Sequence, residues 1–263
     1  MFTAQIKNKD NQTLTLTQNE TDYQILSIIG LTPPKAVINT SPIAGTDGAA
    51  FGSARIDSRN IVITIRINGN VEANRHTLYN YFKVKENCTF YFQNDNLNAF
   101  AVGYIDAFEC DLFSNSETAQ ISIICPNAYF QSVATHTAST VGQTGNITLT
   151  NGGDSETGVN ITVSVSAAIS SFSIKNTRTS EGLTFEKEFQ SGDVINISTV
   201  VREKKATLTR SGVTTPLFSA MSADSEFFQI LSGNNAIEIK ADNGAYSSKL
   251  NASFSFREAY RGL

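Results

Sequence analysis

The 263-residue sequence has no tryptophan, and it is poor in cysteine, histidine, proline and charge. Only 17% of its residues are charged, and 20 basic against 24 acidic side chains leave a net charge of -4. A chain without a basic excess lacks the field that holds nucleic acid or an anionic membrane. No apolar run reaches the ~18 residues that span a bilayer, and residues 1–12 lack the apolar core of a signal peptide. We therefore expect a soluble protein, made in a cytoplasm, without membrane insertion or specific nucleic-acid binding.

The few cysteines and histidines predict neither a disulfide framework nor a metal site. Cys88, Cys110 and Cys125 are odd in number and form no CxxC pair, so we interpret them as small core residues that stay reduced. His76 and His136 lack the spacing of metal ligands. Phosphate-binding loops and the GxSxG nucleophile motif are absent from the sequence. We expect no catalytic, cofactor-binding or metal-binding residues, and no enzyme.

Two acidic pairs, Glu109 with Asp111 and Glu186 with Glu188, have the i, i+2 spacing that places both carboxylates on one side of a strand. Such a pair is typical either of acid–base or calcium chemistry or, more often, of a solvated face. We favour the solvated face for both pairs.

One basic cluster lies at residues 202–210, with Lys204 and Lys205 between Arg202 and Arg210. Glu203 interrupts the cluster, and no aromatic residue is interleaved to stack on bases. We interpret it as a charged turn that discourages edge-to-edge pairing of strands.

Alternation of apolar and polar residues recurs along the first half and predicts strands at 13–17, 61–67, 89–92 and 120–124. A helix is predicted after Asn70, which can cap it, with Glu72 in the first turn and an end near Lys83 or Lys85. Residues 36–60 are rich in Gly, Ala, Ser and Asp, too irregular for a continuous strand. This segment suits either an extended arm onto a neighbouring subunit or an ordinary surface loop.

The composition changes near Pro126, where residues 131–145 form an uncharged stretch of Thr, Ser, Ala and Gly. We place a linker there, between an N-terminal domain at 1–130 and a C-terminal domain at 131–263. Short strands separated by turns predict an antiparallel sandwich for the second domain. The predicted strands are 147–150, 160–165, 171–174, 183–189, 193–201, 206–210, 227–231, 236–240 and 249–256. The fold class is therefore mainly β.

Several short motifs, in their order along the chain, resemble the distal tail protein family of long-tailed phages. In the first half they are Gly30-Leu31 before Pro33-Pro34, Gly45-x-Asp47-Gly48, Arg59-Asn60-Ile61, the helix with Glu72, Arg75, Leu78 and Tyr79, Gly103-Tyr104-Ile105, Gln120 to Ile123, Cys125-Pro126 and Tyr129-Phe130. In the second half they are Gly192-Asp193-x-Ile195-x-Ile197, Asp224-Ser225-x-Phe227-Phe228, Leu231-x-Gly233-x-Asn235 and Tyr260 to Leu263. Where this chain has Phe227 or Phe228, many relatives have tryptophan.

The resemblance implies a β-rich N-terminal domain, with one helix, that closes into a hexameric ring, and a galectin-like C-terminal sandwich. It implies a structural virion protein, assembled in the host cytoplasm, that joins a tail-tube protein to a tail-tip or receptor-binding protein. DNA would pass through the ring without binding, consistent with nine basic and twelve acidic residues in 1–130. The alternative is a tail adhesin that binds carbohydrate through the C-terminal sandwich, although such sites usually need an exposed aromatic plane and the chain has no tryptophan.

Overall fold

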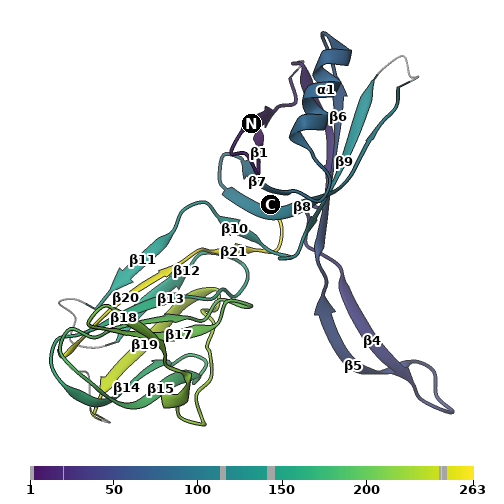
Figure 1. Ribbon diagram of the computed structural model, residues 1–263. Coiled ribbons are helices and arrows are strands. Elements are labelled where there is room, and N and C mark those ends of the chain that lie inside the picture. Colours follow the sequence, from purple (N-terminus) through teal and green to yellow (C-terminus); the bar gives the residue numbers. More distant parts are fainter. Residues whose placement is uncertain (1–2, 20, 113–116, 141–145, 243, 245–247) are drawn as a thin grey trace. The chain divides into compact units, whose positions relative to one another are not determined.

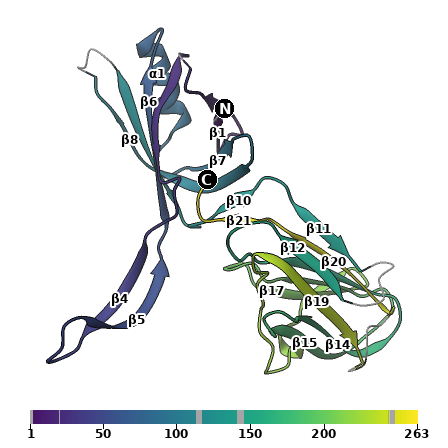
Figure 2. The ribbon, with the colours of Figure 1, turned by 180° about the vertical axis from the view of Figure 1, so that it is seen from behind.

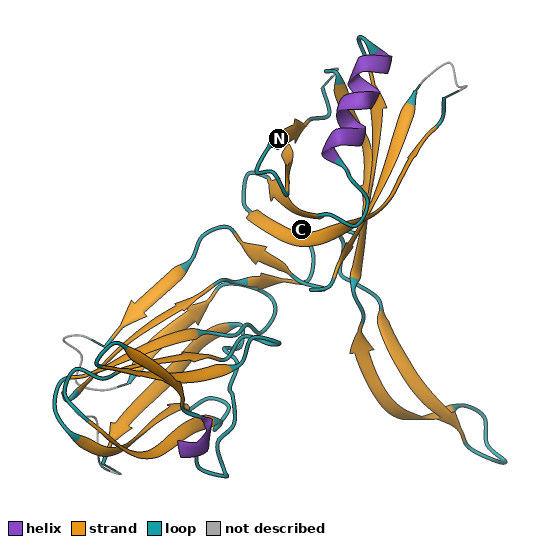
Figure 3. Cartoon of the chain, in the orientation of Figure 1, coloured by secondary structure: helices purple, strands orange, loops and turns teal. Residues whose placement is uncertain are grey.

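The computed structural model describes residues 3–19, 21–112, 117–140, 146–242, 244 and 248–263. The chain forms two compact units, one of residues 1–133 with 260–263 and the other of residues 134–259. Strands dominate both units, as Figures 1 and 3 show, and the described residues contain one α-helix. The predicted mainly-β class is confirmed.

The first unit is built on a nine-stranded sheet in which seven strands follow the order β2-β1-β7-β8-β9-β6-β3 and all their pairs are antiparallel. A parallel bridge between Thr17 and Gln24 joins the two ends of this order. The sheet therefore curls almost into a closed barrel, which leaves little free strand edge. Its strands are β1 (Thr3–Asn8), β2 (Thr13–Leu16), β3 (Tyr23–Ile29), β6 (Arg59–Ile67), β7 (Asn87–Gln93), β8 (Asn98–Cys110), β9 (Thr118–Cys125), β10 (Phe130–Ser132) and β21 (Ala259–Tyr260).

The core of the first unit follows from the alternation in the sequence. In β6 every second side chain from Arg59 to Ile67 is buried, and β9 alternates in the same way. Helix α1 (Val71–Tyr81) adds Leu78, and Phe82 follows directly after it. The predicted cap is present, because Asn70 Oδ1 accepts a hydrogen bond from the Ala73 amide at 3.3 Å.

Residues 36–60, which the sequence analysis expected to be irregular, form a β-hairpin and the start of β6. Strand β4 (Ala36–Pro42) pairs with β5 (Ala49–Ile56) in a separate two-stranded sheet. A bulge opposite Asn39 and Thr40 leaves Gly52 without a partner. This extra residue breaks the period-2 pattern and hides the two strands from sequence analysis. The prediction of an irregular segment was wrong.

The second unit is the predicted antiparallel sandwich. One sheet has the order β11-β20-β13-β16-β17-β18 and the other β12-β19-β14-β15. Side chains of both sheets form one core, which includes Phe172, Phe185 and Phe254. The elements are β11 (His136–Ser139), β12 (Ile147–Asn151), β13 (Asn160–Val165), β14 (Ile169–Asn176), β15 (Gly182–Phe189), β16 (Val194–Ser198), β17 (Lys205–Arg210), β18 (Val213–Pro216), the 3-10 turn η1 (Phe218–Ala220), β19 (Gly233–Ala241) and β20 (Leu250–Phe256).

Residues 227–231 are not the predicted strand, although Phe228 and Ile230 are buried. One isolated β-bridge joins Ile230 to Thr157. Elsewhere in this segment, side-chain amides form hydrogen bonds of the kind that a neighbouring strand would otherwise supply. The Asn151 amide donates to Ile230 O at 3.2 Å, and the Asn235 amide donates to Leu231 O at 2.7 Å. These contacts satisfy the carbonyl groups of Ile230 and Leu231 without strand partners on both sides, so the alternation here reflects burial without a sheet.

The connection between the units also differs from the predicted linker at 131–145. Residues 130–132 lie in β10 and residues 136–139 in β11, while residues 141–145 lie outside the described residues. The C-terminal residues 260–263 belong to the first unit rather than to the predicted domain at 131–263. Residues 131–140 therefore lie largely in two short strands, so their uncharged composition does not mark a linker here.

Candidate interaction surfaces

The β4–β5 hairpin carries large apolar side chains that remain partly or mostly exposed to solvent. Figure 2 shows the hairpin from behind as a separate ribbon of the first unit. All eight residues of β5 are exposed, and Ile38, Phe51 and Ile56 are 59%, 69% and 37% exposed. Single exposed apolar residues are ordinary on a protein surface, but a cluster on one thin hairpin indicates an interaction surface.

The register of the hairpin places these side chains on one face. Ile38 is opposite Ala54, Ala36 is opposite Ile56, and Phe51 is opposite Thr40. Side chains alternate between the two faces along β4, so Ala36, Ile38 and Thr40 share one face. Paired residues point to the same face, and the partners of Ala36 and Thr40 are Ile56 and Phe51. The bulge at Gly52 therefore places Phe51 on the same face as Ile38 and Ile56. The other side carries Val37, Asn39, Ser41, Ser53 and Arg55. The hairpin is therefore amphipathic, with an apolar face and a mostly polar face.

Arg59, the first residue of β6, is a buried arginine that has backbone carbonyls as its partners. It is 3% exposed, and its guanidinium donates to the carbonyls of Gly30, Thr32, Ala128 and Arg261. The guanidinium carbon also lies 4.3 Å from the centre of the Phe130 ring. Burial lowers the pKa of Arg59, and nearby Cys125 opposes this shift. The guanidinium thus holds together three segments that are distant in the sequence.

Two glycines permit the close packing of these segments. A Cβ atom at Gly30, which has φ +92°, would lie 2.1 Å from Asn60 O. A Cβ atom at Gly262 would lie 2.8 Å from Pro33 Cδ, and the Leu263 amide donates to Leu31 O at 3.0 Å. We call the site formed by Arg59 with the segments 30–33, 128–130 and 261–263 the Arg59 junction. Several of the motifs that carried the family resemblance meet there.

The residues considered for chemistry are dispersed. His76 lies on α1 with its ring 5.7 Å from that of Tyr79, and His136 lies on β11 with its Nε2 3.4 Å from Glu258 Oε1. Glu109 is exposed on β8, and Glu186 and Glu188 are exposed on β15. In the part of the chain that the structure describes, no three His, Cys, Asp or Glu side chains are placed to hold a metal ion.

The three cysteines are free thiols in the first unit. Cys88 and Cys125 are buried, and burial raises their pKa values to about 12 and about 11. Cys110 is partly exposed, and burial together with Glu117 raises its pKa. Gly103 makes room for the Cys125 sulfur, because a Cβ atom there would lie 2.8 Å from it. Buried thiols with raised pKa values are poor nucleophiles.

The basic cluster at 202–210 does not act as one patch. Arg210 lies on β17, where its guanidinium donates to both carboxylate oxygens of Asp193 at 2.8 and 2.6 Å. This bond, more than any other contact, lowers the pKa of Asp193. Lys204 lies 5.4 Å from the centre of the Phe227 ring instead. The cluster therefore divides into an ion pair and a cation–aromatic contact.

Among the described residues of the sandwich, Phe218 and Phe227 form an aromatic pair that is partly exposed. The ring centres are 6.3 Å apart and the ring planes are tilted by 46°. The two rings therefore do not form the flat platform that stacking on a sugar favours. Among the described residues, no helix is long and apolar enough to cross a membrane.

Models of two protein families match this sequence. Residues 9–125 match the phage tail protein RIFT-related domain, and residues 152–260 match the siphovirus-type tail component, C-terminal domain. A search of the curated proteins finds no match.

Solved structures share the fold. The crystal structure of the SPP1 Dit protein, described as a paradigm of the hub adsorption apparatus in phages that infect Gram-positive bacteria, matches with a TM-score of 0.75 and 12% identity over 98% of this chain and 99% of that chain. A chain of the phage P2 baseplate in its activated conformation with Ca matches with a TM-score of 0.49 and 11% identity over 100% of both chains. The family models cover both halves of the sequence, and this chain belongs to the distal tail protein family of siphophages, which are structural proteins of the phage tail.

Proposed function

We propose that this protein forms a ring of six copies at the distal end of a phage tail, where it joins the tail-tube protein to the tail-tip or receptor-binding protein. The ring assembles in the host cytoplasm, carries out no catalysis and lets DNA pass without binding it. The family membership and the likeness of the fold to a hub protein support this function.

The observation that carries the proposal is the apolar face of the β4–β5 hairpin. Full burial of an Ile or Phe side chain contributes roughly 1.5–3 kcal/mol. Ile38, Phe51 and Ile56 are partly covered already, so a neighbouring copy that covered the rest would gain part of this amount at each. We assign this face to a neighbouring copy. The sequence left two alternatives open for residues 36–60, an arm onto a neighbouring subunit or a surface loop, and we therefore propose the arm. A hairpin of one copy that binds a different surface of the next makes a heterologous contact, and such contacts form a ring when the rotation from one copy to the next closes.

The experiment is light scattering coupled to size exclusion at micromolar protein concentration. The expected mass is six times the 28.5 kDa of one chain. Replacing Ile38 and Phe51 together by Ser should shift the protein to single copies, because the apolar face is lost while the hairpin pairing remains.

The matched control lies on the other face of the same hairpin, where Asn39 Nδ2 donates to Ser53 Oγ at 2.9 Å. Replacing these two residues by Ala should leave the mass of the ring unchanged. Equal loss of the ring in both double variants would contradict the assignment of the apolar face. A stable two-fold dimer of the unmodified chain would contradict the ring itself.

A further inference from the structure

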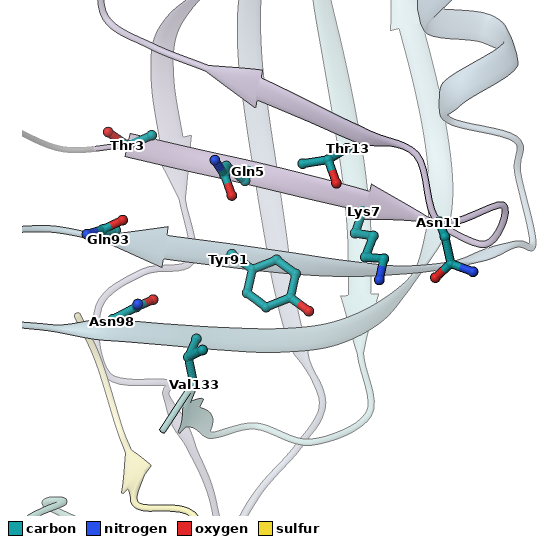
Figure 4. A pocket seen from close by; sticks show the side chains of 9 residues that line it. All are labelled: Thr3, Gln5, Lys7, Asn11, Thr13, Tyr91, Gln93, Asn98 and Val133. Atoms are coloured by element: carbon teal, nitrogen blue, oxygen red, sulfur yellow. The ribbon is translucent and has the colours of Figure 1, made fainter. Parts of the chain in front are cut away.

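The outer face of the first unit's sheet contains a polar hollow of about 410 Å³ (Figure 4). It lies across β2, β1, β7 and β8, where side chains at every second position point away from the core. Its volume is within the range of small-molecule sites, about 300–1,000 Å³. The lining residues are Thr3, Gln5, Lys7, Asn11, Thr13, Tyr91, Gln93, Asn98 and Val133.

The hollow has an aromatic ring at its centre with side-chain amides around it. Figure 4 shows Tyr91 between Gln5 and Lys7 on one side and Asn98 and Val133 on the other. Phe100, on the neighbouring strand, supports the Tyr91 ring with a centre-to-centre distance of 5.8 Å. The ring is therefore held in place while part of it remains accessible.

The polar groups of the hollow are available for a ligand. In the described part of the chain, the side chains of Gln5, Lys7, Gln93 and Asn98 make no hydrogen bond or ion pair with another protein group. An amide group offers two donors and one acceptor oxygen, which suits hydroxyl groups that both donate and accept. The lining thus offers several unused hydrogen-bonding groups around one aromatic face.

This combination corresponds to the chemistry of a sugar. A pyranose ring has a face of C–H groups that packs on an aromatic ring, and its edge carries hydroxyls that bond to amides. The cores of protein interfaces are rich in aromatic residues, Met and Arg, whereas this lining has one aromatic ring and neither Met nor Arg. Nucleic acid would need several cations for its phosphates, whereas Lys7 is the only charged residue of the lining.

We propose that this hollow is a saccharide-binding site in which a sugar ring stacks on Tyr91 and its hydroxyls bond to Gln5, Gln93 and Asn98. Lys7 contributes a cation and the lining contains no carboxylate. The site therefore prefers a short saccharide that carries an acidic group, such as a uronic acid. This activity is additional to the tail hub function, and it places sugar recognition on the first unit rather than on the sandwich.

The test uses the full chain on an array of short oligosaccharides of neutral hexoses, N-acetylhexosamines and uronic acids, followed by titration calorimetry with the saccharides that bind. Tyr91→Ala should weaken binding at least tenfold, and Gln5→Ala with Gln93→Ala should weaken it without disturbing the buried core. Saccharides with a uronic acid should bind about two- to fivefold more tightly than their neutral counterparts, and Lys7→Met should remove this preference.

The matched control is Tyr104→Ala. Tyr104 is an exposed tyrosine of β8, the strand that pairs with the strand of Tyr91, and it does not line the hollow. This substitution should change affinity less than twofold. The proposal is overturned if no saccharide on the array binds, or if binding survives both the Tyr91→Ala and the Gln5 and Gln93 variants. It is also overturned if these variants reduce the mass of the ring instead of sugar affinity, since the hollow would then be a contact between copies.

Discussion

Replacement of Arg59 by Met should destabilise the first unit far more than any exposed arginine would. The substitution removes the donor that serves four backbone carbonyls, those of Gly30, Thr32, Ala128 and Arg261. A buried carbonyl left without a donor costs roughly 1–3 kcal/mol. Two effects reduce the total loss of stability, because methionine keeps some of the packing on Phe130 and does not bury a charge. We expect a net loss of about 3–5 kcal/mol in the free energy of unfolding.

Thermal unfolding followed by circular dichroism measures this loss. For a unit of this size it corresponds to a decrease of about 10–20 °C in melting temperature. Hydrogen exchange assigns the effect to the Arg59 junction, because the Leu263 amide, bonded to Leu31 O at 3.0 Å, should lose its protection first. Arg59→Lys should be intermediate, since one ammonium cannot reach carbonyls that lie around a planar guanidinium.

The control for this prediction is Arg55→Met. Arg55 is an exposed arginine of the hairpin whose Nε lies 2.9 Å from Asp57 Oδ1. A surface pair of this kind contributes roughly 0–1 kcal/mol. If Arg59→Met and Arg55→Met lowered the melting temperature equally, or if exchange at residues 260–263 did not change, the reasoning about the Arg59 junction would be refuted.

Three other predictions concern the thiols, acid stability and DNA. Thiol labelling at pH 8 should modify Cys110 first in the native protein, because Cys88 and Cys125 are buried with strongly raised pKa values, and denaturation should expose three free thiols. The bond from Arg210 lowers the pKa of the Asp193 carboxyl in the folded protein. The bond therefore stabilises the second unit fully at pH values above the unfolded Asp pKa of about 3.9. This stabilisation is lost as the pH falls through the lower pKa of the folded state. The melting difference between the unmodified chain and Arg210→Met should therefore shrink below about pH 4, and a difference that stayed constant with pH would count against this. Fluorescence anisotropy should detect no binding to duplex DNA near physiological salt, weaker than the ~10⁻⁴ to 10⁻⁶ M of nonspecific binders; submicromolar, salt-sensitive binding would contradict it.

The strands were predictable wherever burial alternates strictly along a strand. Ile61, Ile63 and Ile65 point into the core of the first unit, as their spacing predicted. Extending the same alternation back by one step places Arg59 inward as well. The sequence therefore contained a signal for the buried arginine, but its partners come from segments up to 202 positions away, which no local pattern reveals.

The misassigned segments share a physical cause, since their backbone does not follow a simple ladder. In the hairpin the unpaired Gly52 shifts the side-chain pattern by one residue. At 227–231 the amides of Asn151 and Asn235 replace strand partners, so buried residues alternate without a sheet. The hollow around Tyr91 was equally hidden, because Gln5 is brought next to Tyr91 only by the pairing of β1 with β7. Asn98 is likewise brought to Gln93 by the pairing of β7 with β8.

The most direct test of the central claim is negative-stain electron microscopy of the purified full chain. The proposed hub predicts closed rings with six-fold symmetry and a central channel, and these rings should disappear when Ile38 and Phe51 are both replaced by Ser. Particles with two-fold symmetry, or six-fold rings that persist unchanged in this double variant, would contradict the account in which the apolar face of the hairpin closes the ring.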